Sequence, residues 1–294
     1  MKKLFLLFAL CCSLLLIFGC SETPQITEPT GDATIGVMVQ RPQFIDSRPQ
    51  TVIEQFTLNY TELANQIYKK PTPPPPDTGA DPNPNPPHKY AYIVGISDYE
   101  GTANDLQYCD DDAIDMKAYF QSQGFTCRMD LDLNATGDAI TAGLQWLIDN
   151  ASPGDEIAFS YSGHGGNAPS YGSSLISADL YYVTHGYVMS YFNAINCSKK
   201  LVTIDACVIG DFHDDVVSGT FMATASDGSY SYDVPAFEHG AWTYFWLIGV
   251  NDLNKIFAED AAVYAETEMK AWAKLYHVRV TPIHTDMYDG MFDM

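Results

Sequence analysis

Basic residues are scarce in this sequence. Lys and Arg total 15 against 37 Asp and Glu, which gives a formal net charge of −22. Nucleic acid is therefore excluded as a partner, because binding phosphates requires a basic face. The acidic excess is typical of a soluble, self-repelling surface. It also suits a basic peptide as a ligand, because opposite charge attracts such a molecule.

Long hydrophobic runs are missing beyond the first twenty residues. A basic start and an apolar run over residues 4–18 are typical of an export signal, and the run is too short to favour a spanning helix. Ile17-Phe18-Gly19-Cys20 resembles a bacterial lipobox. We therefore predict a lipoprotein signal peptide over residues 1–20, with Cys20 lipidated. Ser21 favours the outer membrane of the bacterial cell envelope. An ordinary secretory signal or a short anchor is the alternative.

Cys-x-x-Cys pairs are also absent. Of the seven cysteines, two leave with the predicted signal and one is the predicted lipid site. The other four show no spacing typical of metal ligands, so we predict no metal site. Because an exported protein meets oxidising conditions, a disulfide, for example between Cys109 and Cys127, is an open alternative to free thiols. The four remaining cysteines are Cys109, Cys127, Cys197 and Cys207.

Proline divides the chain. Residues 21–70 are predicted to be a largely disordered membrane-proximal segment, with one short helix within residues 51–69. Residues 71–88 form a proline-rich linker, typical of a stiff polyproline spacer. A ligand for a proline-recognition domain is the alternative for this stretch. The folded domain is predicted to span residues 89–294.

Apolar runs and helical patterns alternate along that domain. This alternation predicts an α/β fold with a mostly parallel sheet. A long loop is expected after residue 161, and a second loop is expected over residues 208–218. The predicted strands cover residues 90–96, 125–131, 156–161, 201–205, 220–225 and 278–283, and the predicted helices cover residues 110–123, 136–150, 187–195, 242–250 and 256–277.

Two of the predicted core strands end abruptly in small residues and one reactive side chain. The stretch 157–166 presents His164, and the stretch 201–210 presents Cys207. Glycine after a buried strand lets the backbone turn sharply. Because ligands bind at the carboxyl edge of an open parallel sheet, we expect His164 and Cys207 to meet there.

A cysteine and a histidine brought together in this way can act as nucleophile and base. The Cys207 thiolate would attack a carbonyl while His164 carries the proton, forming an acyl-enzyme. The backbone N–H groups of Gly165 and Cys207 are candidates for the oxyanion hole. The alternatives are a simple glycine-rich turn and a buried core cysteine. Three other histidines lack this glycine-rich strand-end setting: His185, His213 and His239.

Four separated motifs resemble those of the caspase-like cysteine peptidases, specifically the metacaspase branch of the peptidase C14 family. They are Tyr161-Ser-Gly-His164-Gly, Asp205-Ala-Cys207, Tyr92-Ile-Val-Gly-Ile-Ser-Asp-Tyr99 and Cys109-Asp-Asp-Asp112-Ala113. The resemblance implies a three-layer sandwich, in which a six-stranded, mostly parallel sheet carries helices on both faces. It also implies that His164 and Cys207 form the catalytic dyad, with Gly165 contributing to the oxyanion hole.

The same resemblance implies a substrate pocket built from Cys109, Asp112, Ser162 and Asp205. Two carboxylates in one pocket attract a guanidinium or ammonium group, so cleavage after Arg or Lys is expected. The alternative for the acids near Asp112 is compensation of the helix dipole. The alternative for Asp205 is a buried, hydrogen-bonded strand end.

The sequence departs from the metacaspase pattern in three places. Val208-Ile209-Gly210 replaces the usual His-Ser-Gly after the cysteine. Asp179 is the only acid between Gly165 and Lys200, too few for a calcium site of six to eight oxygens, so we predict no cofactor. No Lys or Arg occurs over residues 208–254, which predicts a single-chain enzyme without self-cleavage there.

The sequence thus predicts a lipid-anchored, monomeric cysteine endopeptidase that acts on protein or peptide substrates at basic residues. A catalytically silent caspase-like domain that binds basic peptides or partner proteins is the alternative. A transpeptidase that uses the same acyl-enzyme is a third hypothesis.

Overall fold

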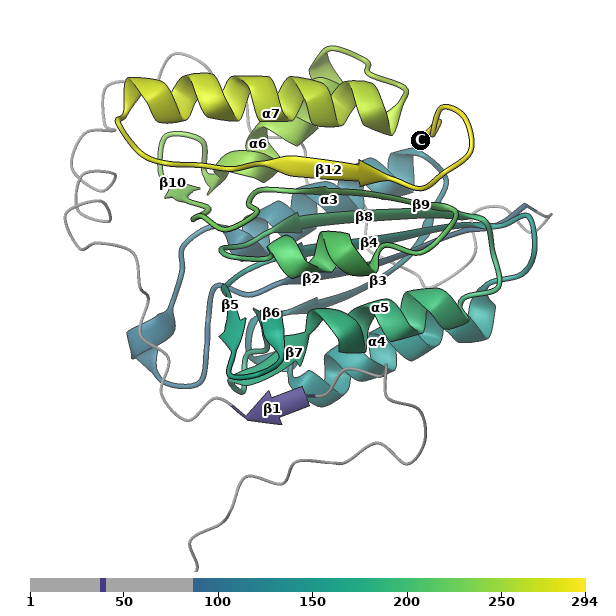
Figure 1. Ribbon diagram of the computed structural model, residues 1–294, viewed down its shortest axis with the longest axis horizontal. Helices are drawn as coiled ribbons and strands as arrows, with labels where there is room; N and C mark the ends of the chain where they lie inside the picture. Colours follow the sequence, from purple (N-terminus) through teal and green to yellow (C-terminus); the bar gives the residue numbers. More distant parts are fainter. Residues whose placement is uncertain (1–37, 41–86) are drawn as a thin grey trace, which may run out of the picture.

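The computed structural model describes residues 38–40 and 87–294, and its centre is a six-stranded sheet (Figure 1). The strand order is β12-β9-β8-β4-β2-β3, and all neighbours are parallel except β12, which is antiparallel to β9. This confirms the predicted mostly parallel sheet. The strands are β2 (Lys89–Gly95), β3 (Thr126–Leu131), β4 (Glu156–Ser162), β8 (Lys199–Asp205), β9 (Thr220–Thr224) and β12 (Ile283–Asp286).

Helices cover both faces of the sheet, so the domain is the expected three-layer sandwich (Figure 1). Alternate side chains of a strand point to opposite faces. Ala91 and Ile93 pack in one core cluster, whereas Tyr92 and Val94 pack in the other. The first cluster includes residues of α3 (Cys109–Ser122), α6 (Ala241–Leu247) and α7 (Ala258–Leu275), and the second includes residues of α4 (Gly137–Asn150) and α5 (His185–Ala194).

The helix ends follow from local chemistry. The Thr136 side chain accepts a hydrogen bond from the N–H of Ala139 at 3.2 Å, which confirms the predicted cap of α4. Thr184 caps α5 in the same way. α6 ends earlier than predicted, because the chain continues as a π-helical turn, η4 (Ile248–Asp252).

The long loop expected after residue 161 contains a small antiparallel sheet instead. Its strands have only three to five residues, and glycine and serine in two of them hide the alternation that would mark a strand. The order is β1-β7-β6-β5, and β1 (Met38–Gln40) comes from before the proline-rich stretch. The other strands are β5 (Gly165–Ala168), β6 (Gly172–Ile176) and β7 (Tyr181–Thr184).

The prediction for the last strand was wrong in position. β12 covers Ile283–Asp286 rather than residues 278–283. Pro282 cannot donate to a ladder, so pairing with β9 begins only after it. Before it, the carbonyl of Thr281 accepts the N–H of Asp227 at 2.8 Å.

Two further short elements stand near the carboxyl edge of the sheet. The expected loop over residues 208–218 contains a 3-10 helix, η3 (Gly210–Asp215). A two-stranded ribbon of β10 (Asp233–Val234) and β11 (His239–Gly240) precedes α6.

Several predictions fall on other parts of the chain. The signal peptide, Cys20, the short helix within residues 51–69 and the linker before residue 87 lie outside the described residues. Among the described helices, none combines the length and the apolar character needed to cross a bilayer. Cys109 and Cys127 are free thiols rather than a disulfide, as are Cys197 and Cys207.

Candidate active site

The site is built where β2, β4 and β8 end side by side. Gly95, Ser162 and Asp205 are in register across the three strands. A Cβ at Gly95 would overlap the carbonyl oxygen of Cys109 and lie 2.5 Å from the Cβ of Ala113. Because residue 95 is glycine, the first turn of α3 packs directly on the end of the sheet. This contact brings the predicted pocket residues of α3 beside those of β4 and β8.

His164 follows β4 and is held by hydrogen bonds at both backbone and ring. Its N–H donates to the Tyr99 hydroxyl at 2.7 Å, and the Tyr161 hydroxyl donates to its carbonyl at 2.8 Å. Its Nε2 lies 2.8 Å from the carbonyl oxygen of Asn104. A carbonyl can only accept, so Nε2 carries the hydrogen and Nδ1 is the ring nitrogen suited to take a proton. The imidazole is thereby oriented for use as a base.

Cys207 follows β8 and is half-buried. The N–H of Ser231 points at its Sγ at 3.3 Å, and that sulfur lies 3.6 Å from the Ser231 carbonyl oxygen. The N–H donated to the sulfur favours the thiolate, whereas the carbonyl oxygen can only accept a hydrogen bond and favours the thiol. The backbone of Ser231 therefore touches the candidate nucleophile directly.

One cavity is lined by both His164 and Cys207, together with Cys109, Ser162 and Asp205. Five of the predicted site residues are thus brought together. Gly165 lies beside them, since a Cβ there would sit 3.0 Å from the backbone N of Cys207. This proximity of the two backbones is what the predicted oxyanion hole requires.

Asp112 is fully buried behind that cavity rather than in its wall. Its Oδ2 accepts the Ser162 hydroxyl at 2.6 Å, and its Oδ1 lies 2.7 Å from Nδ1 of His239. The N–H of Gly240 also points at this carboxylate, at 3.1 Å. Asp112 is thus saturated by donors from the protein itself.

Asp205 lines the cavity and accepts from neutral donors. Ser231 donates its hydroxyl to Oδ1, while the N–H and hydroxyl of Thr243 donate to Oδ2 at 2.9 and 3.1 Å. Burial, followed by the charge of nearby Asp112, raises the pKa of Asp205 to about 7. Its charge therefore changes near neutral pH.

Cys109 lies in the same wall as a neutral thiol. Burial, followed by the charges of Asp233 and Asp112, raises the pKa of Cys109 well above its ordinary value. Its Sγ is 3.6 Å from Oδ1 of Asp233. Cys109 is therefore a pocket residue and is unsuited to act as a competing nucleophile.

Sequence reasoning missed Asp233, Ser231 and Asn104. Asp233 is the second carboxylate in the cavity wall, beside Asp205; it is only partly buried, and its Oδ2 accepts the N–H of Gln107 at 2.9 Å. Asp233 and Ser231 come from a polar loop after β9 in which no motif stands out. Asn104 acts through its backbone carbonyl, which no side-chain pattern can reveal.

The Val208-Ile209-Gly210 departure has a structural explanation. Ile209 is fully buried in the core cluster beneath α4 and α5. The N–H of Val208 donates to the Ser229 carbonyl at 2.9 Å, and the N–H of Gly210 donates to the Asp227 carbonyl at 3.1 Å. The turn after Cys207 is thus anchored by packing and by backbone hydrogen bonds. Val208 adopts a φ of 53°, which is strained for a β-branched residue.

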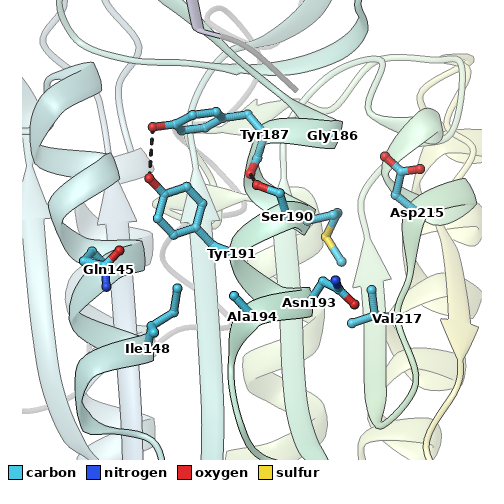
Figure 2. Close-up of a pocket in the computed structure, with 11 residues that line it drawn as sticks. Gln145, Ile148, Gly186, Tyr187, Ser190, Tyr191, Asn193, Ala194, Asp215 and Val217 are labelled. Atoms are coloured by element: carbon cyan, nitrogen blue, oxygen red, sulfur yellow. Dashed lines mark hydrogen bonds between the residues drawn. The ribbon is translucent and has the colours of Figure 1, made fainter. Parts of the chain in front are cut away.

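The cavity beside the dyad is small, about 20 Å³. A wider groove of about 640 Å³ lies between α4 and α5 on the surface of the domain. Figure 2 shows the Tyr187 and Tyr191 hydroxyls bonded to each other there, at 3.2 Å. The groove contains none of the predicted site residues.

Asp179, the single acid noted in the loop after His164, is engaged in a helix cap. Its Oδ1 accepts the N–H of Gly137 at 2.8 Å and the Ser177 hydroxyl at 2.6 Å. Within residues 38–40 and 87–294, no group of three or more His, Cys, Asp or Glu side chains is arranged to hold a metal ion. The absence of calcium dependence stays a prediction.

Comparisons with known proteins agree with this architecture. A solved protein structure from Geobacter sulfurreducens has a similar fold, with a TM-score of 0.56 and 18% identity over 69% of this chain and 95% of the other. Metacaspase-1 of Debaryomyces hansenii is 36% identical over 89 residues, and Metacaspase-1 of Mycosarcoma maydis is 31% identical over 87 residues. Each match covers 26% of this chain and about a fifth of the relative, 20% and 21% respectively.

The family model for the caspase domain matches residues 88–263, which include both strand-end motifs and the first turn of α3. That stretch is more than half of the chain. Together with the sheet order and the metacaspase relatives, it shows that this chain belongs to the caspase-domain family of cysteine peptidases, as a metacaspase-type member.

Proposed function

We propose that this protein is a cysteine endopeptidase that hydrolyses peptide bonds after Arg or Lys, with Cys207 as nucleophile and His164 as base. The observation that carries the proposal is the single cavity lined by His164, Cys207 and two carboxylates, Asp205 and Asp233. Membership of a cysteine-peptidase family supports the reaction class. The specificity rests on the charges in the cavity.

In this mechanism, Nδ1 of His164 takes the proton of the Cys207 thiol as sulfur attacks the scissile carbonyl carbon. The carbonyl oxygen becomes an oxyanion, which the N–H groups of Gly165 and Cys207 stabilise. The tetrahedral intermediate collapses, and His164 returns the proton to the leaving amine. Water, deprotonated by His164, then attacks the thioester and releases the acid and the free thiol.

A basic side chain of the substrate would bind against the carboxylates of the cavity. None of the residues that line this cavity is Lys or Arg, so an acidic side chain would meet no counter-charge there. A volume of about 20 Å³ holds about one water molecule. Substrate binding therefore requires the backbone near Ser231 to move away from Cys207.

The proposal includes a location at the bacterial cell envelope. Lipidation at Cys20 would hold the protein in the bacterial cell envelope, at the outer membrane, and the enzyme would act there as a monomer without a cofactor. The partners would be proteins or peptides with exposed basic residues, and nucleic acid would not be among them, as the net charge of −22 indicates.

Reporter peptides that end in Arg, Lys or Asp test this function. The full chain, reduced and assayed with and without calcium, should cleave the Arg and Lys reporters. Cys207→Ala should lower the rate by at least about 10,000-fold. Cys197→Ala is the matched control, because Cys197 is another half-buried free thiol but lies outside the cavity. Absence of Cys207-dependent turnover would disprove the peptidase, and a preference for Asp would disprove the specificity.

One observation favours a second candidate, a catalytically silent domain that binds basic peptides. The Ser231 backbone lies against the Cys207 sulfur, at 3.3 and 3.6 Å, and the cavity beside them is only about 20 Å³. In that case Cys207→Ala would retain binding of Arg-containing peptides, and the wild type would bind them without cleaving them. Calorimetry with an uncleaved Arg peptide distinguishes this candidate from the peptidase.

A further inference from the structure

His239 is a buried histidine held between two carboxylates behind the cavity. Its side chain is 2% exposed. Nδ1 lies 2.7 Å from Oδ1 of Asp112, and Nε2 lies 3.2 Å from Oδ2 of Asp115. Ionised carboxylates only accept hydrogen bonds, so each ring nitrogen must carry a hydrogen. The geometry therefore assigns a positively charged imidazolium to His239.

The residue next to His239 separates the two acids of the site. A Cβ at Gly240 would overlap Oδ2 of Asp205 and lie 2.8 Å from Oδ2 of Asp112. The two carboxylates thus both lie close to Gly240, and the charge of Asp112 opposes the ionisation of Asp205. Their immediate surroundings differ: Asp112 has a cationic partner, whereas Asp205 accepts from the neutral groups of Ser231 and Thr243.

We propose that His239 is a positioning residue that sets the charge of the substrate pocket. Its imidazolium neutralises Asp112, so Asp205 can ionise beside it, and Asp205 with Asp233 supplies the negative charge that binds a basic side chain. This inference rests on the proposed function and refines it. Asp112 organises the pocket from behind and does not meet the substrate.

The groups around His239 agree with this role. The elements that pack against β11 are α3, α6 and β10. α3 contributes Asp112 and Asp115, α6 contributes the Tyr244 ring at 6.4 Å between centroids, and β10 contributes Asp233, which pairs with Gly240. Burial opposes protonation, but the hydrogen bonds to Asp112 and Asp115 outweigh it and raise the pKa of His239 to about 9.

The test is the pH dependence of cleavage by His239→Gln. Glutamine keeps a donor but removes the positive charge that offsets Asp112, so Asp205 should retain its proton to higher pH. The acid limb of kcat/KM for an Arg reporter should move up by about one pH unit, mainly through KM. Activity at pH 7 should fall about tenfold and recover by about pH 9.

His284→Gln is the matched control, because His284 also contacts a carboxylate at 2.6 Å, but that carboxylate is Glu266, which is not an acid of the pocket. It should leave the pH profile unchanged. His239→Lys restores a positive charge and should move the acid limb back toward that of the wild type. An unshifted limb in His239→Gln, or a loss of activity that is equal at every pH, overturns the proposal.

A measurement without turnover separates this inference from the proposed function. NMR titration of the His239 ring in the wild-type protein should show it protonated from pH 6 to pH 8, and Asp112→Asn should lower its pKa. Titration of the wild-type ring near pH 6.5 overturns the proposal even if the enzyme is active. The opposite outcome is a His239 ring that stays protonated up to pH 8 in a protein that cleaves neither Arg nor Lys reporters. That result would support the charge arrangement proposed for His239 and disprove the peptidase function.

Discussion

The molecule has two hollows of opposite character. The cavity at the carboxyl edge of the sheet is about 20 Å³ and is lined by thiols, an imidazole and carboxylates. The groove between α4 and α5 is about 640 Å³ and is lined largely by tyrosines, small polar residues and aliphatic side chains (Figure 2). In the cavity, buried donors fix each reactive group, whereas in the groove two hydroxyls bind each other. Preorganised polar groups, rather than volume, are the reason for proposing the cavity as the active site.

Among substitutions that test this contrast between cavity and groove, the largest loss of activity is expected at Asp205. Asp205→Asn removes the cavity's buried charge and should lower kcat/KM for Arg and Lys reporters about 100-fold, because losing one partner of a buried charge pair costs on the order of 2–5 kcal/mol. Steady-state kinetics measures the change. Asp211→Asn is the control, since Asp211 also accepts a backbone N–H, from Ser173 at 2.8 Å, but lies outside the cavity. Full activity of Asp205→Asn would remove Asp205 from the pocket.

A smaller effect is expected at Asp233, which is only partly buried. Asp233→Asn should raise KM for Arg reporters about fivefold with little change in kcat, because a partly solvated ion pair contributes about 1 kcal/mol or less. Glu238→Gln removes an exposed charge from the same loop and should have no effect. If both variants raise KM equally, the overall negative charge of the loop attracts the substrate, and Asp233 makes no specific contact with it.

The smallest effect on catalysis is expected in the groove. Tyr191→Phe removes the hydrogen bond to the Tyr187 hydroxyl and should lower the free energy of unfolding by about 1 kcal/mol. Urea denaturation measures this loss. Reporter kinetics should stay within twofold of the wild type. A tenfold loss of activity would show that the two hollows are coupled.

The parts of the fold that the sequence predicts well are those with a strong local signal. β4 and β8 are continuous apolar runs, so their position and their strand-end residues His164 and Cys207 could be located in advance. β5, β6 and β7 were missed because their few residues carry no clear alternation. β12 was placed too early because Val278 and Val280 are apolar and pack on the core without joining the ladder.

The residues of the candidate site also divide into those with a strong local sequence signal and those without one. Cys109, Ser162 and Asp205 are attached to recognisable strand and helix ends, and the structure brings them to one cavity. Asp233 reaches it, and His239 lies behind it, on a ribbon of two-residue strands that are too short to show a sequence pattern. Asp112 lies behind the cavity and does not line it. The spacing of residues along the sequence cannot predict this, because it depends on how the side chains pack.

Gly240 also restricts which sequences this site can accept. Several other glycines have open space around the missing Cβ and are required only by their backbone angles, as at Gly101 and Gly154. At Gly240 the obstacle is the two carboxylates themselves. If position 240 is randomised and active clones are selected, we expect glycine alone to survive. The Cβ of alanine would meet the Oδ2 atoms of both Asp205 and Asp112, and replacing Asp205 to make room would itself lower activity.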